Sequence, residues 1–224
     1  MFLSKITLNP RSFEARRDAA APYELHRTLA HAFETVPGRD YRVEHGVLFR
    51  LEPLSYRDAQ PTILVQSHTE PDWSRLPEHY TTSVKYTAAD PDFVSGQTFQ
   101  FRLVANPTRK EKREGRKQGR RVALADYLTQ DDEADAPTAA QAWLSRKGQQ
   151  HGFEILWAGS DDFWYEAAKG STVESRQAIP LYGVRFDGML RVTDPILFKA
   201  ALQSGIGPAK AFGFGLLSLA PARF

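Results

Sequence analysis

The sequence has no cysteine among its 224 residues, which excludes disulfide bonds and zinc sites built on cysteine. It also has no apolar run of 18 residues, and Met1 to Leu8 alternates in polarity instead of forming the apolar block of a signal peptide. We therefore expect no segment that inserts in or crosses a membrane. The composition is compatible with the reducing cytoplasm.

Nucleotide-binding and metal-binding motifs are missing as well. The sequence holds no GxGxxG fingerprint and no GKS or GKT, which argues against dinucleotide and P-loop nucleotide sites. None of its six histidines falls into HxH or HExxH spacing. We therefore expect neither a metal site nor a cofactor.

The net charge of +2 hides a strongly basic segment from Arg109 to Arg121. Eight lysines and arginines less Glu111 and Glu114 give this segment a charge of +6, so the rest of the chain carries −4. Basic charge concentrated in this way suits a nucleic-acid partner, and a solvated loop without a partner is the alternative. With two glycines inside it, we expect the segment to be mobile until a polyanion binds.

A second unusual segment is Gly205 to Gly215, which holds four glycines, one proline and Lys210. Gly205 follows a helical pattern that ends at Ser204, where a residue at positive φ can close the helix. Backbone N–H groups exposed by glycine, together with a lysine, suit a phosphate. The alternative is a glycine-rich connection that only packs against its own sheet.

The polarity pattern predicts two similar series of elements. In the first half we expect a strand at Phe2 to Leu8, a basic connection at Arg11 to Arg17 and a helix at Pro22 to Phe33. Three strands follow, at Arg42 to Leu51, Thr62 to Ser67 and Ser83 to Tyr86. In the second half we expect a strand at Gln97 to Ala105, a helix at Thr138 to Gln150 and two short strands at Phe153 to Trp157 and Phe163 to Glu166. A strand pair at Ala178 to Val192, turned at Asp187-Gly188, then precedes a helix at Pro195 to Gln203 and a last strand at Leu216 to Leu219.

Both series approximate the order β-α-β-β-(α)-β. We therefore predict an α+β protein with two tandem ferredoxin-like (RRM-like) βαββαβ domains, at residues 1–90 and 97–224. Pro91 to Gly96 is the expected hinge between them.

The helix that begins at Pro22 carries the candidate catalytic side chains. At about 100° per residue, Tyr23 and His26 lie about 60° apart on one face, and Arg27 lies beside Tyr23. An imidazole transfers protons near neutral pH, a phenol orients a hydroxyl, and a guanidinium holds a phosphate. The alternative is that the histidine and tyrosine are incidental surface residues.

Four landmarks together resemble a known family. They are the opening strand that ends at Asn9-Pro10, the helix with PYELHRTL, the strand FRLVANP before a basic stretch, and the terminal GIGPAKAFGFGLLSLAP. The chain from Met1 to Pro221 resembles the CasE-type CRISPR repeat-processing endoribonucleases, which are subunits of the type I-E Cascade complex.

The resemblance implies two ferredoxin-like domains that bind the stem-loop of CRISPR precursor RNA, cut at the 3′ base of the stem without metal, and keep the mature crRNA. A 2′-hydroxyl attacks the adjacent phosphate and leaves a 2′,3′-cyclic phosphate. Tyr23 and His26 become the catalytic pair. The RNA-binding candidates are Arg27, His31, Lys169, Arg176 and Lys210, of which Lys169 and Arg176 belong to an expected basic β-hairpin. Other Cascade subunits are the implied protein partners of a chain that is monomeric when alone.

Two other interpretations stay open at this point. The chain is then either a stem-loop-binding scaffold subunit that does not cut, or a ferredoxin-like protein of unrelated function. Both nucleic-acid interpretations predict RNA affinity that falls steeply with salt, but only the nuclease interpretation predicts a product that is lost when His26 is replaced.

Overall fold

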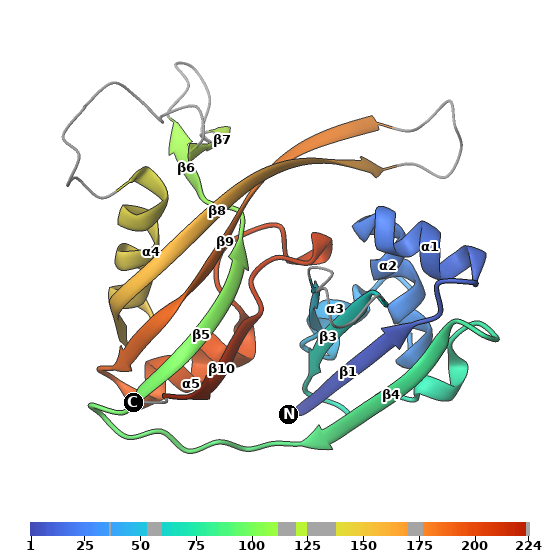
Figure 1. Ribbon diagram of the computed structural model, residues 1–224, viewed down its shortest axis with the longest axis horizontal. Helices are drawn as coiled ribbons and strands as arrows, with labels where there is room; N and C mark the ends of the chain where they lie inside the picture. The colour runs from blue at the N-terminus through green and yellow to red at the C-terminus, as the bar shows by residue number, and fades with distance from the viewer. Residues whose placement is uncertain (36, 53–59, 112–119, 125–137, 170–176, 223–224) are drawn as a thin grey trace.

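Two four-stranded antiparallel sheets, one from each half of the chain, form the framework of the protein (Figure 1). The computed structural model describes residues 1–222 except 36, 53–59, 112–119, 125–137 and 170–176. The strand orders are β2-β3-β1-β4 and β10-β5-β9-β8, so the first strand of each half lies between the third and fourth strands of its own series. This is the arrangement of the ferredoxin-like fold, and the predicted class is confirmed.

The first sheet consists of β1 (Phe2–Leu8), β2 (Leu48–Leu51), β3 (Thr62–Ser67) and β4 (Thr81–Ala88). It is covered by α1 (Phe13–Ala20) and α2 (Pro22–Leu29), which continues into the 3-10 turn η1 (Ala30–Ala32). Pro22 stands at the start of α2, where its missing N–H is harmless. Leu25 and Leu29 of α2 are fully buried against the sheet, as their spacing predicts. The second helix of the plan is reduced to the 3-10 turn η2 (Trp73–Arg75).

The prediction that Arg11 to Arg17 forms only a connection is wrong, because α1 begins at Phe13. The Ser12 side chain caps this helix by accepting from the Ala15 N–H at 3.2 Å. Asp18, which is fully buried, accepts the Tyr80 hydroxyl at 2.8 Å and pairs with Arg17 at 2.6 Å. A helix that buries alanine and a paired aspartate shows no apolar stripe in the sequence.

The prediction of a strand from Arg42 to Leu51 is also wrong for its first residues. Its beginning forms the short helix α3 (Tyr41–Glu44), which Asp40 caps by accepting from the Arg42 N–H at 3.0 Å. Gly46, at φ 59°, then turns the chain into β2. Tyr41 is consequently placed on a helix, beside α2, and not on the sheet.

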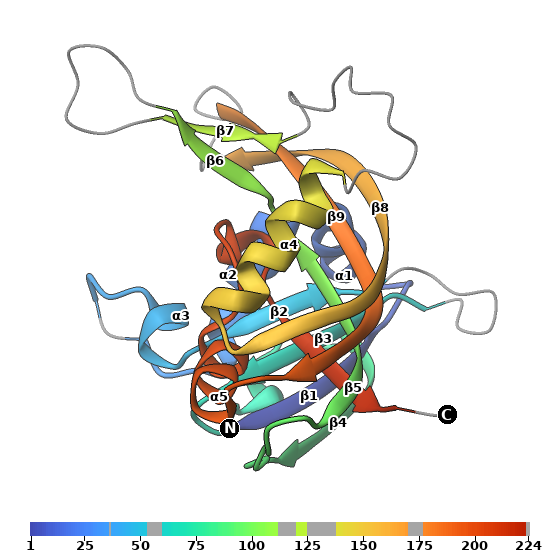
Figure 2. The same cartoon turned by 90° about the vertical axis from the view of Figure 1, so that its left-hand side faces the viewer.

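The second sheet consists of β5 (Thr98–Ala105), β8 (Phe153–Lys169), β9 (Gln177–Val192) and β10 (Leu217–Pro221). Its helices, α4 (Ala139–Gln150) and α5 (Pro195–Ser204), cover the same face (Figure 2). α4 begins with a capping box of Thr138 and Gln141. Trp143 of α4 and Phe198 of α5 are buried in the hydrophobic core between these helices and the sheet.

β8 and β9 form one long hairpin, so the predicted pair of short strands and the predicted turn at Asp187-Gly188 are wrong. A bulge between Ile155 and Trp157 lets β8 run on as a single strand. Gly188 lies inside β9, where a Cβ atom would clash with the carbonyl oxygen of Trp157. The glycine therefore permits close packing and does not make a turn. The hairpin extends from the second sheet toward the first half, where β8 contacts α2 (Figure 1).

The basic segment, which we expected to be mobile until a polyanion binds, is structured at both ends. β6 (Thr108–Glu111) and β7 (Arg120–Ala123) form a two-stranded antiparallel sheet, with Arg109 opposite Val122. The residues between them, 112–119, lie outside the described part of the chain. The two strands hold the start and end of the basic segment together.

A buried arginine joins the two sheets. Arg50 on β2 is 2% exposed, and its guanidinium donates to the carbonyl oxygens of Leu216 (3.1 Å) and Arg102 (3.2 Å) and to the Ser218 hydroxyl (2.6 Å). Its Nε donates to the Glu52 carboxylate at 2.7 Å. Arg50 thus connects the first half to β5 and β10 of the second half.

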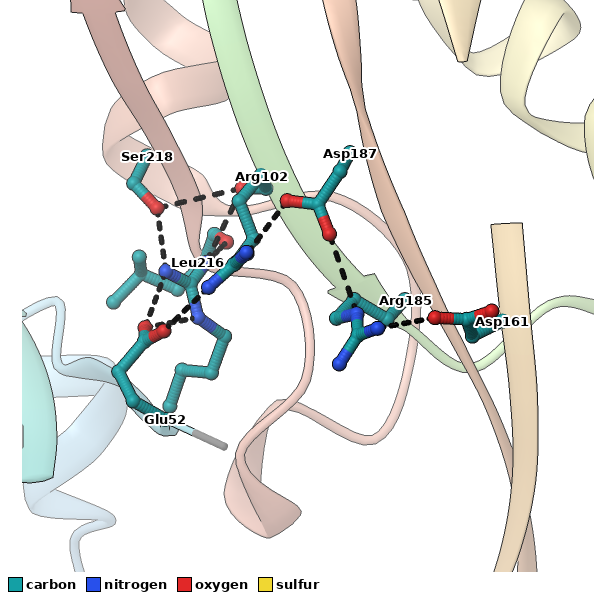
Figure 3. A network of polar contacts seen from close by, with 8 residues as sticks. Glu52, Arg102, Asp161, Arg185, Asp187, Leu216 and Ser218 are labelled. Atoms are coloured by element: carbon teal, nitrogen blue, oxygen red, sulfur yellow. Dashed lines mark hydrogen bonds and ion pairs between the residues drawn. The ribbon is translucent and has the colours of Figure 1, made fainter. Parts of the chain in front are cut away.

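The same network continues through the second sheet. Glu52 also accepts from Arg102 at 3.0 Å, and Arg102 bonds Asp187 on β9 at 2.6 Å. Arg185 then links Asp187 to Asp161 on β8 (Figure 3). The chain of ion pairs therefore runs from β2 in the first half to the long hairpin.

Among the described residues, no helix combines the length and apolar character that crossing a membrane requires.

Candidate active site

The structure brings together the two side chains that the helical spacing predicts. The rings of Tyr23 and His26 lie 6.4 Å apart on α2, and both side chains are half-buried. Tyr23 also lies 6.1 Å from the ring of Phe212, which belongs to the 3-10 turn η4 (Lys210–Phe212) inside the glycine-rich segment. The pair therefore lies where α2 of the first half meets the glycine-rich segment of the second.

Besides Tyr23, two stacked aromatic rings and one hydroxyl lie next to His26. The imidazole stacks on Tyr41 at 5.0 Å and on Phe49 at 6.4 Å. Its Nδ1 lies 3.0 Å from the Tyr41 hydroxyl oxygen, and this hydroxyl donates its proton to the His26 carbonyl oxygen at 2.6 Å. Tyr41 lies 15 residues from His26, and no local pattern in the sequence predicts that the two side chains meet.

Burial is the main cause that lowers the pKa of His26 below its usual value, because it disfavours the charged imidazolium. The carboxylate of Asp40 opposes this effect, whereas the guanidinium of Arg42 adds to it. The imidazole is therefore neutral at physiological pH, which is the form that accepts a proton.

Arg27 and His31 lie on the surface beside this pair. Arg27 is exposed, and its guanidinium lies 3.3 Å from the Glu24 carboxylate one turn earlier on α2. Such an exposed pair is weak, so the guanidinium can exchange this partner for a phosphate at little cost. His31 is exposed on η1.

The glycine-rich segment closes α5 and packs against the first half. Gly205, at φ 76°, follows the last residue of α5, as predicted. A Cβ atom there would approach Leu48 to within 2.8 Å, and one at Gly213 would lie 3.3 Å from Phe49. The glycines therefore do serve packing, which was one of the two alternatives for this segment, and this packing fixes η4 beside α2.

Lys210, the first residue of η4, lines a cationic pocket of about 390 Å³. Its ammonium donates to the Ser204 carbonyl oxygen at 2.6 Å, while Arg109, Lys147 and His151 contribute further basic side chains to the same pocket. Burial, Arg42 and Lys147 lower the pKa of Lys210. Lys147 and His151 were not predicted, although they stand four residues apart on one face of α4 and at its end.

The hairpin candidates are only partly described. Lys169 is the last residue of β8, opposite Gln177 on β9, and Arg176 lies outside the described residues. Where the chain is described, no group of three or more histidine, aspartate and glutamate side chains is arranged to hold a metal ion.

The tandem ferredoxin-like scaffold carries a half-buried imidazole on α2, and η4, which contacts α2, contributes Lys210 to a cationic pocket. This combination suits a protein that binds and processes nucleic acid. The family model for CRISPR associated proteins matches residues 1–221, and the chain belongs to that family.

Relatives of known name match over almost the whole chain. The chain is 38% identical to the CRISPR-associated endoribonuclease Cse3 of Thermus thermophilus and 28% identical to the CRISPR system Cascade subunit CasE of Escherichia coli. Each match covers 99% of this chain and 100% of the relative. A solved structure of the CRISPR endoribonuclease Cse3 bound to a 19-nt RNA superposes with a TM-score of 0.78 at 38% identity, over 99% of this chain and 100% of that one. The suspected membership in this family is confirmed.

Proposed function

We propose that the chain is an endoribonuclease that binds the stem-loop of CRISPR precursor RNA, cuts at the 3′ base of the stem and keeps the mature crRNA within a Cascade complex. The observation that carries the proposal is the full-length match at 38% identity to a protein named as an endoribonuclease, together with the half-buried His26 and Tyr23 on α2. We propose the cytoplasm as its compartment, since a chain without cysteine is compatible with a reducing environment.

The proposed chemistry is attack by the 2′-hydroxyl on the adjacent phosphate, which leaves a 2′,3′-cyclic phosphate and a 5′-hydroxyl. This reaction needs proton transfer at the attacking and leaving oxygens and positive charge at the phosphorane. We assign proton transfer to His26, orientation of the 2′-hydroxyl to Tyr23, and phosphate binding to Arg27. The three side chains belong to the single helix α2, and we propose that they act on one scissile phosphate.

We propose two further RNA contacts. The hairpin of β8 and β9, with Lys169 and Arg176, contacts the stem, because an A-form stem is recognised through its phosphates and shape. The cationic pocket at Lys210 and the exposed His31 contact the RNA backbone. Cascade subunits are the proposed protein partners.

The test uses the full chain and a labelled hairpin repeat RNA from the same genome. The wild-type protein is expected to bind the RNA and cut it once at the base of the stem. His26→Ala is expected to bind with unchanged affinity and to give no product, while Thr82→Ala, an exposed residue of β4, serves as the matched control and cuts at the wild-type rate.

Tight binding without cleavage by the wild-type protein would contradict the nuclease function and leave the stem-loop-binding scaffold. No RNA affinity and no dependence on salt would instead favour a ferredoxin-like protein of unrelated function.

A further inference from the structure

Tyr41 holds a position beside His26 that the proposed mechanism does not yet use. It is the first residue of α3, it is 7% exposed, and its ring stacks on the imidazole at 5.0 Å. Phe33 stacks on its ring at 5.8 Å and fixes it further. The Tyr41 ring therefore packs against the His26 imidazole, and its hydroxyl lies next to Nδ1 of the histidine.

The position of the Tyr41 hydroxyl proton follows from the two distances. The hydroxyl oxygen lies 2.6 Å from the His26 carbonyl oxygen, a separation that two oxygens reach only when a proton lies between them. A phenol has a single O–H, and the carbonyl has none, so the tyrosine donates to the carbonyl. Only the lone pairs of the hydroxyl oxygen then remain for Nδ1 of His26, 3.0 Å away. Nδ1 must therefore carry a proton and donate it.

Burial keeps this arrangement stable over a wide pH range. It raises the pKa of Tyr41 well above that of a free phenol, and the carboxylate of Asp40 raises it further. The phenol therefore stays protonated and keeps its bond to the carbonyl. Because it is neutral, it orients the imidazole without attracting a second proton to it, as a carboxylate in the same place would do.

We propose that Tyr41 is a positioning residue that fixes His26 in the Nδ1–H tautomer, so that Nε2 is the atom that transfers the proton during RNA cleavage. This inference rests on the proposed function and decides a point that the function leaves open. A neutral imidazole with a proton on Nδ1 has its free lone pair on Nε2, which makes it a general base. Tyr41 is buried and acts through His26, so its role is one of positioning.

The proton balance of the step is then complete. The O2′–H bond breaks as its proton moves to Nε2, and the 2′-oxygen forms a bond to phosphorus. The P–O5′ bond breaks, and the leaving 5′-oxygen takes a proton from water. The hydroxide that remains takes the proton from Nε2, which returns His26 to its neutral form. Throughout the step, Nδ1–H keeps its hydrogen bond to the Tyr41 hydroxyl, so the ring does not rotate between its neutral and charged forms.

The test compares wild-type protein with Tyr41→Phe, which keeps the stacked ring and removes only the hydroxyl. We expect single-turnover cleavage to fall by about 10- to 100-fold, the range found when the hydrogen-bonding partner of a metal-binding histidine is removed. The ¹⁵N shifts of the His26 ring, identified by their loss in His26→Ala, are expected to show a proton on Nδ1 in the wild-type protein above the pKa of His26. In Tyr41→Phe that proton moves in part to Nε2. The charged groups that act on this ring are Asp40 and Arg42, and both remain in the variant.

Tyr80→Phe is the matched control, because Tyr80 is 1% exposed and its hydroxyl donates to Asp18 at 2.8 Å, away from His26. It is expected to lose stability but to keep the His26 shifts and the cleavage rate of the folded protein. Unchanged ring shifts in Tyr41→Phe, or equal rate losses in the two folded variants, would overturn the inference. If the wild-type protein makes no product, the proposed function fails, and the ring shifts still decide whether Tyr41 fixes the tautomer.

Discussion

Replacement of Arg50 by methionine tests how strongly one side chain holds the two sheets together. The guanidinium makes four hydrogen bonds, to Glu52, Arg102, Leu216 and Ser218, and three of them cross from the first half to the second. The methionine side chain matches that of arginine only as far as Nε and carries no charge. Arg50→Met therefore removes every one of these bonds while it keeps most of the apolar stem.

The magnitude follows from two opposing terms. Hydrogen bonds to a charged group contribute about 1.5–3 kcal/mol each, but burial of the guanidinium is costly, and it is the main cause that lowers the pKa of Arg50. Removing one member of a buried ion pair costs about 3–5 kcal/mol, because the other groups stay buried without their partner. Glu52 keeps Arg102 at 3.0 Å, which limits the loss. We expect the free energy of unfolding to fall by about 3 kcal/mol.

Urea unfolding followed by tryptophan fluorescence measures this loss. Arg39→Met is the control, because Arg39 pairs with Glu44 at 3.4 Å with a side chain that is 69% exposed, and an exposed pair contributes less than about 1 kcal/mol. The cleavage rate of the folded Arg50→Met protein is also expected to fall, since the orientation of β8 and η4 against α2 depends on this contact between the halves. A loss of stability no larger than that of Arg39→Met would refute the reasoning.

Two further predictions concern charge. Asp40→Asn, which keeps an amide able to cap α3, is expected to lower the pKa of His26, and Arg42→Gln to raise it, because the carboxylate stabilises the imidazolium and the guanidinium destabilises it. The neutral imidazole is the base, so the single-turnover rate falls on acidification as His26 becomes protonated. The pH at which the rate is half its maximum is expected to be lower in Asp40→Asn and higher in Arg42→Gln than in the wild-type protein. Shifts of the two variants in the same direction would contradict this. Lys210→Gln is expected to weaken RNA binding and to reduce the slope of log affinity against log salt by about 1, as the loss of one phosphate contact does, and an unchanged slope would remove Lys210 from the RNA interface.

Local spacing in the sequence predicted one part of the fold and of the site correctly. Leu25 and Leu29 recur at helical intervals and are fully buried, and the same periodicity placed Tyr23 and His26 on one turn of α2. Gly205 was correctly placed at the end of α5, because a positive φ after a helix is a local requirement. The order of the elements in each half predicted the ferredoxin-like class, which the two strand orders confirm, although the strand bounds in the second half were wrong.

Prediction failed where distant residues decide the outcome. The sequence pattern did not predict α1, because this helix buries Asp18, whose partner Tyr80 lies 62 residues away. Asp187-Gly188 has the composition of a turn, yet Gly188 is needed for close packing of β9 against β8. Tyr41 has no local signal at all, since its role depends on the packing of α3 against α2 across 15 residues.

The central claim, cleavage by attack of a 2′-hydroxyl, is tested most directly by one substitution in the RNA. The wild-type protein is incubated with EDTA and a labelled hairpin repeat RNA, and in parallel with the same RNA carrying a 2′-deoxy nucleotide at the cut. The account predicts that only the unmodified RNA is cut, to a product that ends in a 2′,3′-cyclic phosphate, and that the deoxy RNA is bound equally well but stays intact. Cleavage of the deoxy RNA, or loss of all cleavage in EDTA, would contradict it.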